Sequence, residues 1–353
     1  MRKLGISGAL AAAVLGVLAA PPAVSAVAAA RATALSTPPV AKGTYADVTV
    51  PRATSTEAED ITDSGLIVGC FERPNRPERG FTDQNGKFTT ITHRSGGRAS
   101  AFTCAAGADN AGVIVGAYAN TSGVLHGFVD RHGVFRTINA PHAVRRSGAG
   151  TAAIDINKTG VIVGWFVSSG HVTRGFVLRN GKFRTVNAPG AANSELGGTV
   201  LNGIADDGTI SGAFTSRDGR THGFWLRHGV FHHINVPGAR DTSVACISER
   251  SRLLVGDYRV AGRRRTFGFT FHHGVYRTMR DPSATSATIP QCGNDSGHVA
   301  GFYIGAGGII DGFKFTPGTS SPAVMATRGG NGPAAPATFR GLLSVRAGLR
   351  PAN

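Results

Sequence analysis

The sequence predicts an all-β protein, a six-bladed β-propeller closed by an N-terminal strand that completes the C-terminal blade. Three observations carry this prediction: a glycine-rich phrase recurs along the chain, the segments around it alternate apolar and polar residues, and the last repeat lacks a strand that lies instead near the N-terminus. The chain has 353 residues, of which 50 are Gly and 41% are hydrophobic. This composition excludes wholesale disorder, and the absence of a Gly-X-Y period excludes collagen.

The two ends of the chain differ from its body in composition. Met1-Arg2-Lys3 is followed by an uncharged apolar stretch and then by the small residues of 21–26, the three parts of a secretory signal. We therefore expect a signal peptide at 1–26, a linker at 27–42, the propeller at 43–316 and a flexible tail rich in Pro, Gly, Ala and Arg at 317–353. A membrane anchor is the alternative for the first segment, but its apolar run is short for a bilayer span.

Each repeat contains the phrase Gly-x-(Ile/Val)-x-Gly-x-aromatic. Its copies begin at Gly65, Gly112, Gly160, Gly208, Arg252 (degenerate) and Gly297, 44 to 48 residues apart. A Gly-Phe pair follows, and then a two-residue turn such as Asn85-Gly86, whose residues accept the positive φ of a tight hairpin. With a strand before the phrase and another after the turn, each repeat has four antiparallel strands, a to d, as in a propeller blade.

Closure of the ring is predicted from the displaced strand. The sixth repeat has a strand c at 311–315 but no strand d before the tail, whereas residues 45–51 match the d pattern and precede the first strand a. The N-terminal strand is therefore expected to complete the C-terminal blade, which removes the exposed end of an open array. The alternative is an open β-solenoid, in which this displacement would be a coincidence.

The repeat resembles the HAF family of probable extracellular repeat proteins. The resemblance is fullest from Asp207-Gly208 through His222-Gly223-Phe224 to Val236-Pro237-Gly238, and it covers nearly all of 43–315. The departures replace the His of His-Gly-Phe or the first Gly of the phrase; they are Arg79, Arg174, Phe267, Asp311 and Arg252. The resemblance implies secretion and a repeat fold, but no activity and no catalytic residues.

The four cysteines of a chain expected to be exported suggest disulfides. Cys246 and Cys292 fall at near-equivalent places in the fifth and sixth repeats, while Cys70 in strand b of the first repeat precedes Cys104 in strand a of the second. We therefore expect the pairs Cys70–Cys104 and Cys246–Cys292, each joining adjacent blades. Free buried thiols are the alternative.

Catalytic and metal motifs are absent from the sequence. It contains no Gly-x-Ser-x-Gly elbow, no His-Glu-x-x-His and no P-loop, and its histidines are spread over turns and strand faces of different repeats. Acidic turns such as 60–65 are incomplete as calcium loops and are expected to be Asx turns. We expect no metal and no cofactor.

Charge provides the clearest hint of function. The formal net charge is +16, and the b-to-c and d-to-a connections, which share one rim of a propeller, are basic. The candidate ligand-binding residues of this rim are Arg73, Arg76, Arg79, Arg145, Arg146, Arg174, Arg217, Arg220, Arg263, Arg264 and Arg265. The opposite rim carries Asp63, Asp109, Asp206, Asp207 and Asp295. Because nearly all the basic residues are Arg, compositional drift is an alternative explanation of the rim.

These observations favour a secreted or periplasmic protein that binds rather than catalyses, with an anionic polysaccharide or cell-surface polymer as its partner, because Arg forks suit phosphate, sulfate and carboxylate groups. Specific nucleic-acid binding is not expected, since the rim lacks an aromatic stacking series. The first alternative is a carbohydrate-active or lactone-cleaving enzyme with catalytic residues scattered near the axis. The second is a protein-interaction scaffold. The sequence does not indicate an oligomeric state.

Overall fold

The computed structural model describes residues 38–95, 97–193 and 197–318. These residues are almost entirely β-structure, with one short 3-10 helix, η2 (Ala306–Gly308). The expected signal peptide, the linker as far as residue 37 and the tail beyond Gly318 lie outside the described residues.

The strands form antiparallel four-stranded meanders, each running a-b-c-d. The a strands are β2 (Ser55–Ile61), β8 (Phe102–Ala108), β12 (Thr151–Ile156), β16 (Gly198–Ile204), β20 (Asp241–Ile247) and β24 (Ala287–Gly293). The b strands are β3 (Ile67–Glu72), β9 (Ile114–Ala119), β13 (Ile162–Val167), β17 (Ile210–Thr215), β21 (Leu254–Arg259) and β25 (Val299–Ile304). The c strands are β4 (Arg79–Gln84), β10 (Leu125–Arg131), β14 (Thr173–Arg179), β18 (Thr221–Arg227), β22 (Thr266–His272) and β26 (Ile310–Pro317). The d strands are β5 (Lys87–Ile91), β11 (Val134–Ile138), β15 (Lys182–Val186), β19 (Val230–Ile234), β23 (Val275–Met279) and β1 (Gly43–Val48).

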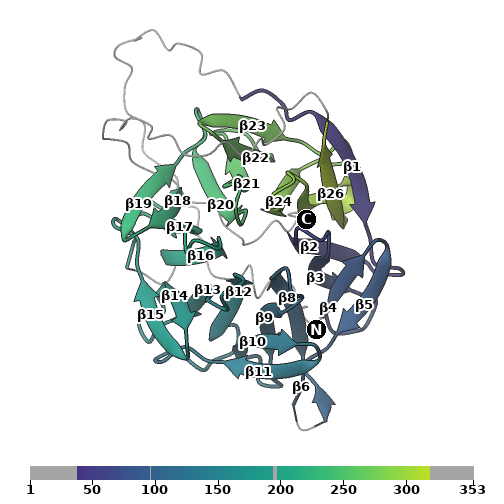
Figure 1. Cartoon of the computed structure of the whole chain (residues 1–353), viewed down its shortest axis with the longest axis vertical. Helices are drawn as coiled ribbons and strands as arrows, with labels where there is room; N and C mark the ends of the chain where they lie inside the picture. Colours follow the sequence, from purple (N-terminus) through teal and green to yellow (C-terminus); the bar gives the residue numbers. More distant parts are fainter. Residues whose placement is uncertain (1–37, 96, 194–196, 319–353) are drawn as a thin grey trace.

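The meanders are arranged radially, with the a strands near the centre and the d strands at the periphery (Figure 1). This is the arrangement of a β-propeller. A two-stranded hairpin, β6 (Arg94–Ser95) with β7 (Arg98–Ala99), projects from the connection between β5 and β8.

The strand nearest the N-terminus lies against the last one. β1 pairs antiparallel with β26 in a continuous register from Gly43 opposite Pro317 to Val48 opposite Gly312. Residues just before β1, in the segment predicted as linker, run beside β23: Thr278 donates its backbone N–H to Pro39 O and accepts the N–H of Ala41.

The repeated phrase has a steric explanation. Its first glycine adopts positive φ, for example 80° at Gly65, and in the degenerate copy Arg252 takes the same conformation at 56°. Its second glycine lies where strand b pairs closely with strand a. A Cβ on Gly164 would lie 2.1 Å from Ala152 O and 3.0 Å from the Phe176 ring. The glycine is therefore needed because strands a and b pack closely together beneath the Phe of the Gly-Phe pair.

The core lies between neighbouring meanders. Phe81, Phe128, Phe176, Phe224, Phe269 and Phe313, the members of the Gly-Phe pairs, are all fully buried. At each junction the first buried residue after strand d donates its N–H to a threonine of the next strand a, as Ala140 does to Thr151 (3.0 Å) and His93 does to Thr103 (3.2 Å). These bonds hold each d-to-a connection in the same position relative to the strand a that follows it.

Candidate ligand-binding site

Both expected disulfides are confirmed. Cys70–Cys104 joins β3 to β8 with a Cα–Cα distance of 4.9 Å, and Cys246–Cys292 joins β20 to β24 at 5.0 Å. Each bond links neighbouring meanders close to the centre. Disulfides of this kind persist in oxidising compartments, which is consistent with an extracellular or periplasmic protein.

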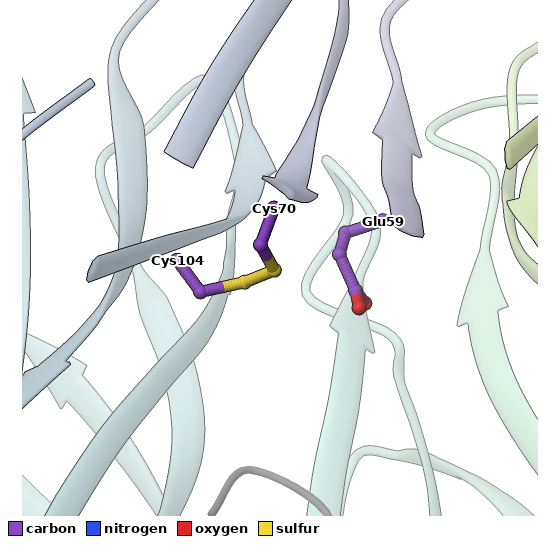
Figure 2. A group of neighbouring side chains, drawn as sticks. All are labelled: Glu59, Cys70 and Cys104. Carbon is purple, nitrogen blue, oxygen red and sulfur yellow. A yellow bond between two sulfur atoms is a disulfide. The ribbon is translucent and has the colours of Figure 1, made fainter. Parts of the chain in front are cut away.

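The carboxylate of Glu59 lies beside the first disulfide (Figure 2). Among the described residues, Glu59, Cys70 and Cys104 are the group whose ligand atoms approach within 4.8 Å of one another. Because the two sulfur atoms are bonded to each other, they offer no thiolate to a metal ion.

The b-to-c and d-to-a connections meet on one rim, as direct contacts show. Arg73 donates to Pro51 O at 3.1 Å, and an Nη of Arg146 lies 3.1 Å from His171 Nδ1. Arg265 donates to Ala284 O. In each case one partner belongs to a b-to-c connection and the other to a d-to-a connection, so the predicted arginines occupy the same rim.

The arginines form separate groups around this rim. Arg76, Arg145, Arg217, Arg263 and Arg264 are exposed, whereas Arg73, Arg79, Arg174 and Arg265 are half-buried. Arg220 is paired with Asp218 at 3.3 Å, which neutralises part of its group. The arginines therefore offer several basic patches rather than one continuous strip.

Sequence reasoning missed the basic hairpin formed by β6 and β7. Its Arg94 lies close enough to Arg79 that the neighbouring charge, added to the larger effect of burial, lowers the pKa of Arg79. A signal was available in the sequence, since Arg94 and Arg98 flank Ser-Gly-Gly in the connection between the first and second repeats.

Two cavities lie side by side on the rim that carries the predicted arginines, separated by the d-to-a residues Ala140–His142 that both share. The first has a volume of about 290 Å³, and its polar lining includes His126, Asn139 and Arg145. The second has a volume of about 490 Å³. It is lined by Ala140, Pro141, His142, Phe166, Ser168, Arg174, Phe176, Phe183 and Thr185. Two of the predicted arginines, Arg145 and Arg174, thus line cavities of the size that small ligands occupy.

The opposite rim is built from the a-to-b turns, which meet around the axis. Asn110 donates to Asp63 at 3.2 Å and to Glu249 at 3.0 Å, although Glu249 belongs to a meander three positions away. Arg250 is paired with Asp63 at 3.5 Å and with Asp295 at 3.2 Å. Most of the acidic residues predicted for this rim, namely Asp63, Asp206, Asp207 and Asp295, are therefore balanced by nearby cations, and the turns link several meanders.

Carboxyl groups of the a strands and a-to-b turns have perturbed pKa values, Asp60, Asp155 and Glu249 among them. Burial, followed by the charges of Asp206 and Asp63, raises the pKa of Glu249 to about 7. Burial likewise raises the pKa of Asp60 to about 7, against the opposing effect of two N–H donors, Ala108 at 2.8 Å and Ile61 at 2.7 Å. Sequence reasoning did not single out Glu249, and it considered Asp60 only as part of the acidic turn 60–65, because nothing in their local sequence distinguishes them from ordinary turn and strand residues.

No protein-family model and no curated protein sequence matches the chain. Among solved structures, a mutant of the Aleuria aurantia lectin in complex with Fucα1-6GlcNAc has 12% identity and a TM-score of 0.48, over 76% of this chain and 93% of that one. TolB from Acinetobacter baumannii has 11% identity and a TM-score of 0.49, over 72% of this chain and 64% of that one. Similarity at this level identifies no ligand for this chain. No helix in the described part of the chain is long and apolar enough to cross a membrane.

Proposed function

We propose that the chain is an exported six-bladed β-propeller of the HAF repeat type, closed by β1, which binds an anionic surface polymer or glycan without transforming it. The closure rests on the register of β1 with β26, and export rests on the N-terminal sequence and the two disulfides. The binding function rests on one observation above all: the two cavities flanking Ala140–His142 open on the basic rim, and arginines line both.

The ligand class follows from the chemistry of this rim. Arginine side chains hold planar anions by paired N–H donors, and a basic surface speeds the encounter with a polyanion. The cavities combine these cations with aromatic and histidine side chains, the mixture that recognises a ring carrying polar substituents. An acidic glycan meets both conditions.

The test is a binding panel on the disulfide-bonded protein. It comprises acidic polysaccharides, neutral polysaccharides, cell-wall polymers and DNA, each at low and at high salt. Saturable binding of one acidic glycan that survives high salt supports the proposal. Equal binding of all polyanions that disappears with salt reduces the function to charge alone, and binding of neutral polymers only contradicts it.

A second candidate function, hydrolysis, is favoured by the pair Glu249 and Asp206. Asp206 is hydrogen-bonded to Glu249, whose pKa is raised to about 7, while Lys158 is paired with Asp206. A carboxyl group with a raised pKa that lies beside a second carboxyl group can act as a general acid. Turnover of a polysaccharide or lactone that is abolished by Glu249→Gln would establish this function, and no turnover across such a panel would reject it.

The exposed apolar residues of the described chain give no support to a scaffold function, because they do not form one face. The large apolar side chains most exposed among the described residues include Val134, Val230 and Val275. Each directly follows the c–d hairpin turn of a different meander, so the three are separated around the periphery.

A further inference from the structure

The junctions between meanders place the same kinds of residue around one spot on the rim that carries the predicted arginines, and at one junction this spot is a recess. Its wall is the strand-b aromatic, the strand-c residue that precedes Gly-Phe, and a residue of strand d; its cover is the first buried residue of the preceding d-to-a connection. At the junction of β11 with the next meander, these residues are Phe166, Arg174, Thr185 and Ala140. Phe166 and Arg174 are directly opposite each other across strands b and c.

At the preceding junction the chain fills this recess with its own ring. His93, which occupies the place of Ala140, is buried and stacks on Tyr118 with a centroid distance of 3.5 Å and an interplanar angle of 11°. Its Nδ1 lies 2.8 Å from Ser100 Oγ. A flat ring with polar edge atoms is therefore the shape that this recess accepts.

The recess over Phe166 is open because alanine replaces histidine. Both His93 and Ala140 donate their backbone N–H to the threonine of the next strand a, so the two residues sit at the same height. The Ala140 methyl group is too short to cover the aromatic ring, and a cavity of about 490 Å³ lies over it.

The polar groups around the open recess have unused bonding capacity. Arg174 donates three hydrogen bonds, from Nε to Ser168 and from its two terminal nitrogens to Asn187 and Asn193. A guanidinium has five N–H groups, and among the described residues these three bonds leave one N–H on each terminal nitrogen that can donate to a carboxylate. Thr185 also lines the recess, whereas its counterpart Thr137 is bonded to the Tyr118 hydroxyl at 3.0 Å. Phe166 has no hydroxyl group, so it cannot form the equivalent hydrogen bond to Thr185.

The other junctions lack this combination. Next along the chain, Ala188 is again small, but His222 replaces Arg174, stacks on Phe214 at 4.3 Å, and has its pKa lowered to about 4 by burial. It is therefore neutral at pH 7. In the first meander, Arg79 keeps the charge, but Arg73 covers the Phe71 ring at 4.8 Å.

We propose that the recess formed by Ala140, Phe166, Arg174 and Thr185 binds a single hexuronic acid residue of an anionic glycan, with the apolar face of the sugar ring on Phe166 and its carboxylate on Arg174. This proposal rests on the proposed function and names its substrate class. It also makes the recess, rather than the rim as a whole, the source of selectivity, because a lone rim arginine attracts any anion whereas the recess selects a ring that carries a carboxylate.

The test is calorimetric titration with methyl glucuronide, methyl glucoside and inorganic phosphate, with an acidic polysaccharide titrated separately. The unmodified protein binds methyl glucuronide at least about tenfold more tightly than the other two small ligands. Ala140→His copies the filled junction, and Arg174→His copies the neutral one. Each lowers methyl glucuronide affinity about tenfold or more, while Arg174→His leaves methyl glucoside binding unchanged.

Matched controls separate the recess from the rim and from folding. Ala188→His makes the same substitution at the next junction, and Arg179→His removes one charge from the far end of β14; both keep methyl glucuronide affinity. Thermal unfolding verifies that Ala140→His folds, and Thr185→Ala offers a second, smaller perturbation that weakens binding. Polysaccharide binding without methyl glucuronide binding overturns the recess and leaves the rim proposal standing. Loss of both overturns both, and equal affinity for phosphate overturns the sugar assignment.

Discussion

Tyr45 offers the sharpest test of ring closure, because its side chain ties β1 to the sheet that it is proposed to complete. Its ring lies 5.3 Å from Phe313 and 5.0 Å from Phe315, and its hydroxyl accepts the backbone N–H of Arg280 at 3.1 Å. Burial raises the pKa of this hydroxyl, which keeps it protonated at neutral pH.

The expected cost of Tyr45→Ala follows from these contacts. Truncating a fully buried aromatic costs about 3–5 kcal/mol, and a half-buried ring costs about half of that, so we expect about 2 kcal/mol from packing. The hydrogen bond adds about 1 kcal/mol, which Tyr45→Phe measures alone. Phe135 is the matched control, since it holds the same position in an internal d strand, 5.2 Å from Phe128 and equally half-buried.

The assay is urea unfolding of the three variants and the unmodified protein, monitored by far-UV circular dichroism. If β1 completes the last meander, Tyr45→Ala lowers the free energy of unfolding by as much as Phe135→Ala, to within about 1 kcal/mol. A loss of only a few tenths of a kcal/mol at Tyr45 beside a loss of about 2 kcal/mol at Phe135 would refute the reasoning, because β1 would then be a detachable edge.

Three further outcomes are expected. Replacing Cys246 and Cys292 together by Ser lowers the free energy of unfolding by about 4 kcal/mol, because the 46-residue separation of the pair removes much chain entropy from the unfolded state; urea unfolding with and without reductant measures it. Glu249 has a folded-state pKa of about 7 against a usual 4.5, so the folded protein holds a proton that the unfolded chain releases, and stability falls as the pH rises through that window; Asp60 contributes a slope of the same sign, so Glu249→Gln makes the slope shallower in a pH series of thermal unfolding curves without removing it. Replacing the three arginines at 263–265 by Ala weakens polyanion binding and makes its salt dependence shallower, and unchanged binding in a salt titration would remove this patch from the site.

Most of the frame could be predicted from the sequence because steric constraints recur in every repeat. A glycine such as Gly164 is required where strand b packs closely against its neighbour, strand a. A residue able to adopt positive φ is required at each a-to-b turn, as Gly65 and Arg252 show. The disulfide pairs were predictable from the same repeat, since Cys246 and Cys292 hold equivalent positions in adjacent a strands, and Cys70 in strand b of one repeat faces Cys104 in strand a of the next. Residue types that the local backbone geometry requires recur at the same position in each repeat, and this recurrence is visible in the sequence.

The site could be predicted only in part because its residues have no common task. The rim arginines were found from charge and loop position, but Arg174 and Arg79 also differ in what covers the neighbouring aromatic ring. Arg73 of the same meander covers the ring beside Arg79, whereas the ring beside Arg174 faces Ala140 of the preceding meander, and contacts of this kind cannot be read from the local sequence. The cluster around Glu249 was missed for the same reason, since Asn110 reaches it from the far side of the axis.

The repeat thus separates two kinds of position, and this separation explains how one unit can hold different sites. The threonine that receives the d-to-a N–H is kept at successive junctions, as Thr103 and Thr151 show, so the backbone holds one geometry. The donor's own side chain has no part in that bond and is free to vary between His93 and Ala140. A change in this one side chain is expected to cover or uncover the aromatic ring beneath it while the backbone keeps its position. In the proposed recess, selectivity therefore depends on the side chain that faces the ring, while the arginines around it supply attraction that any anion would feel.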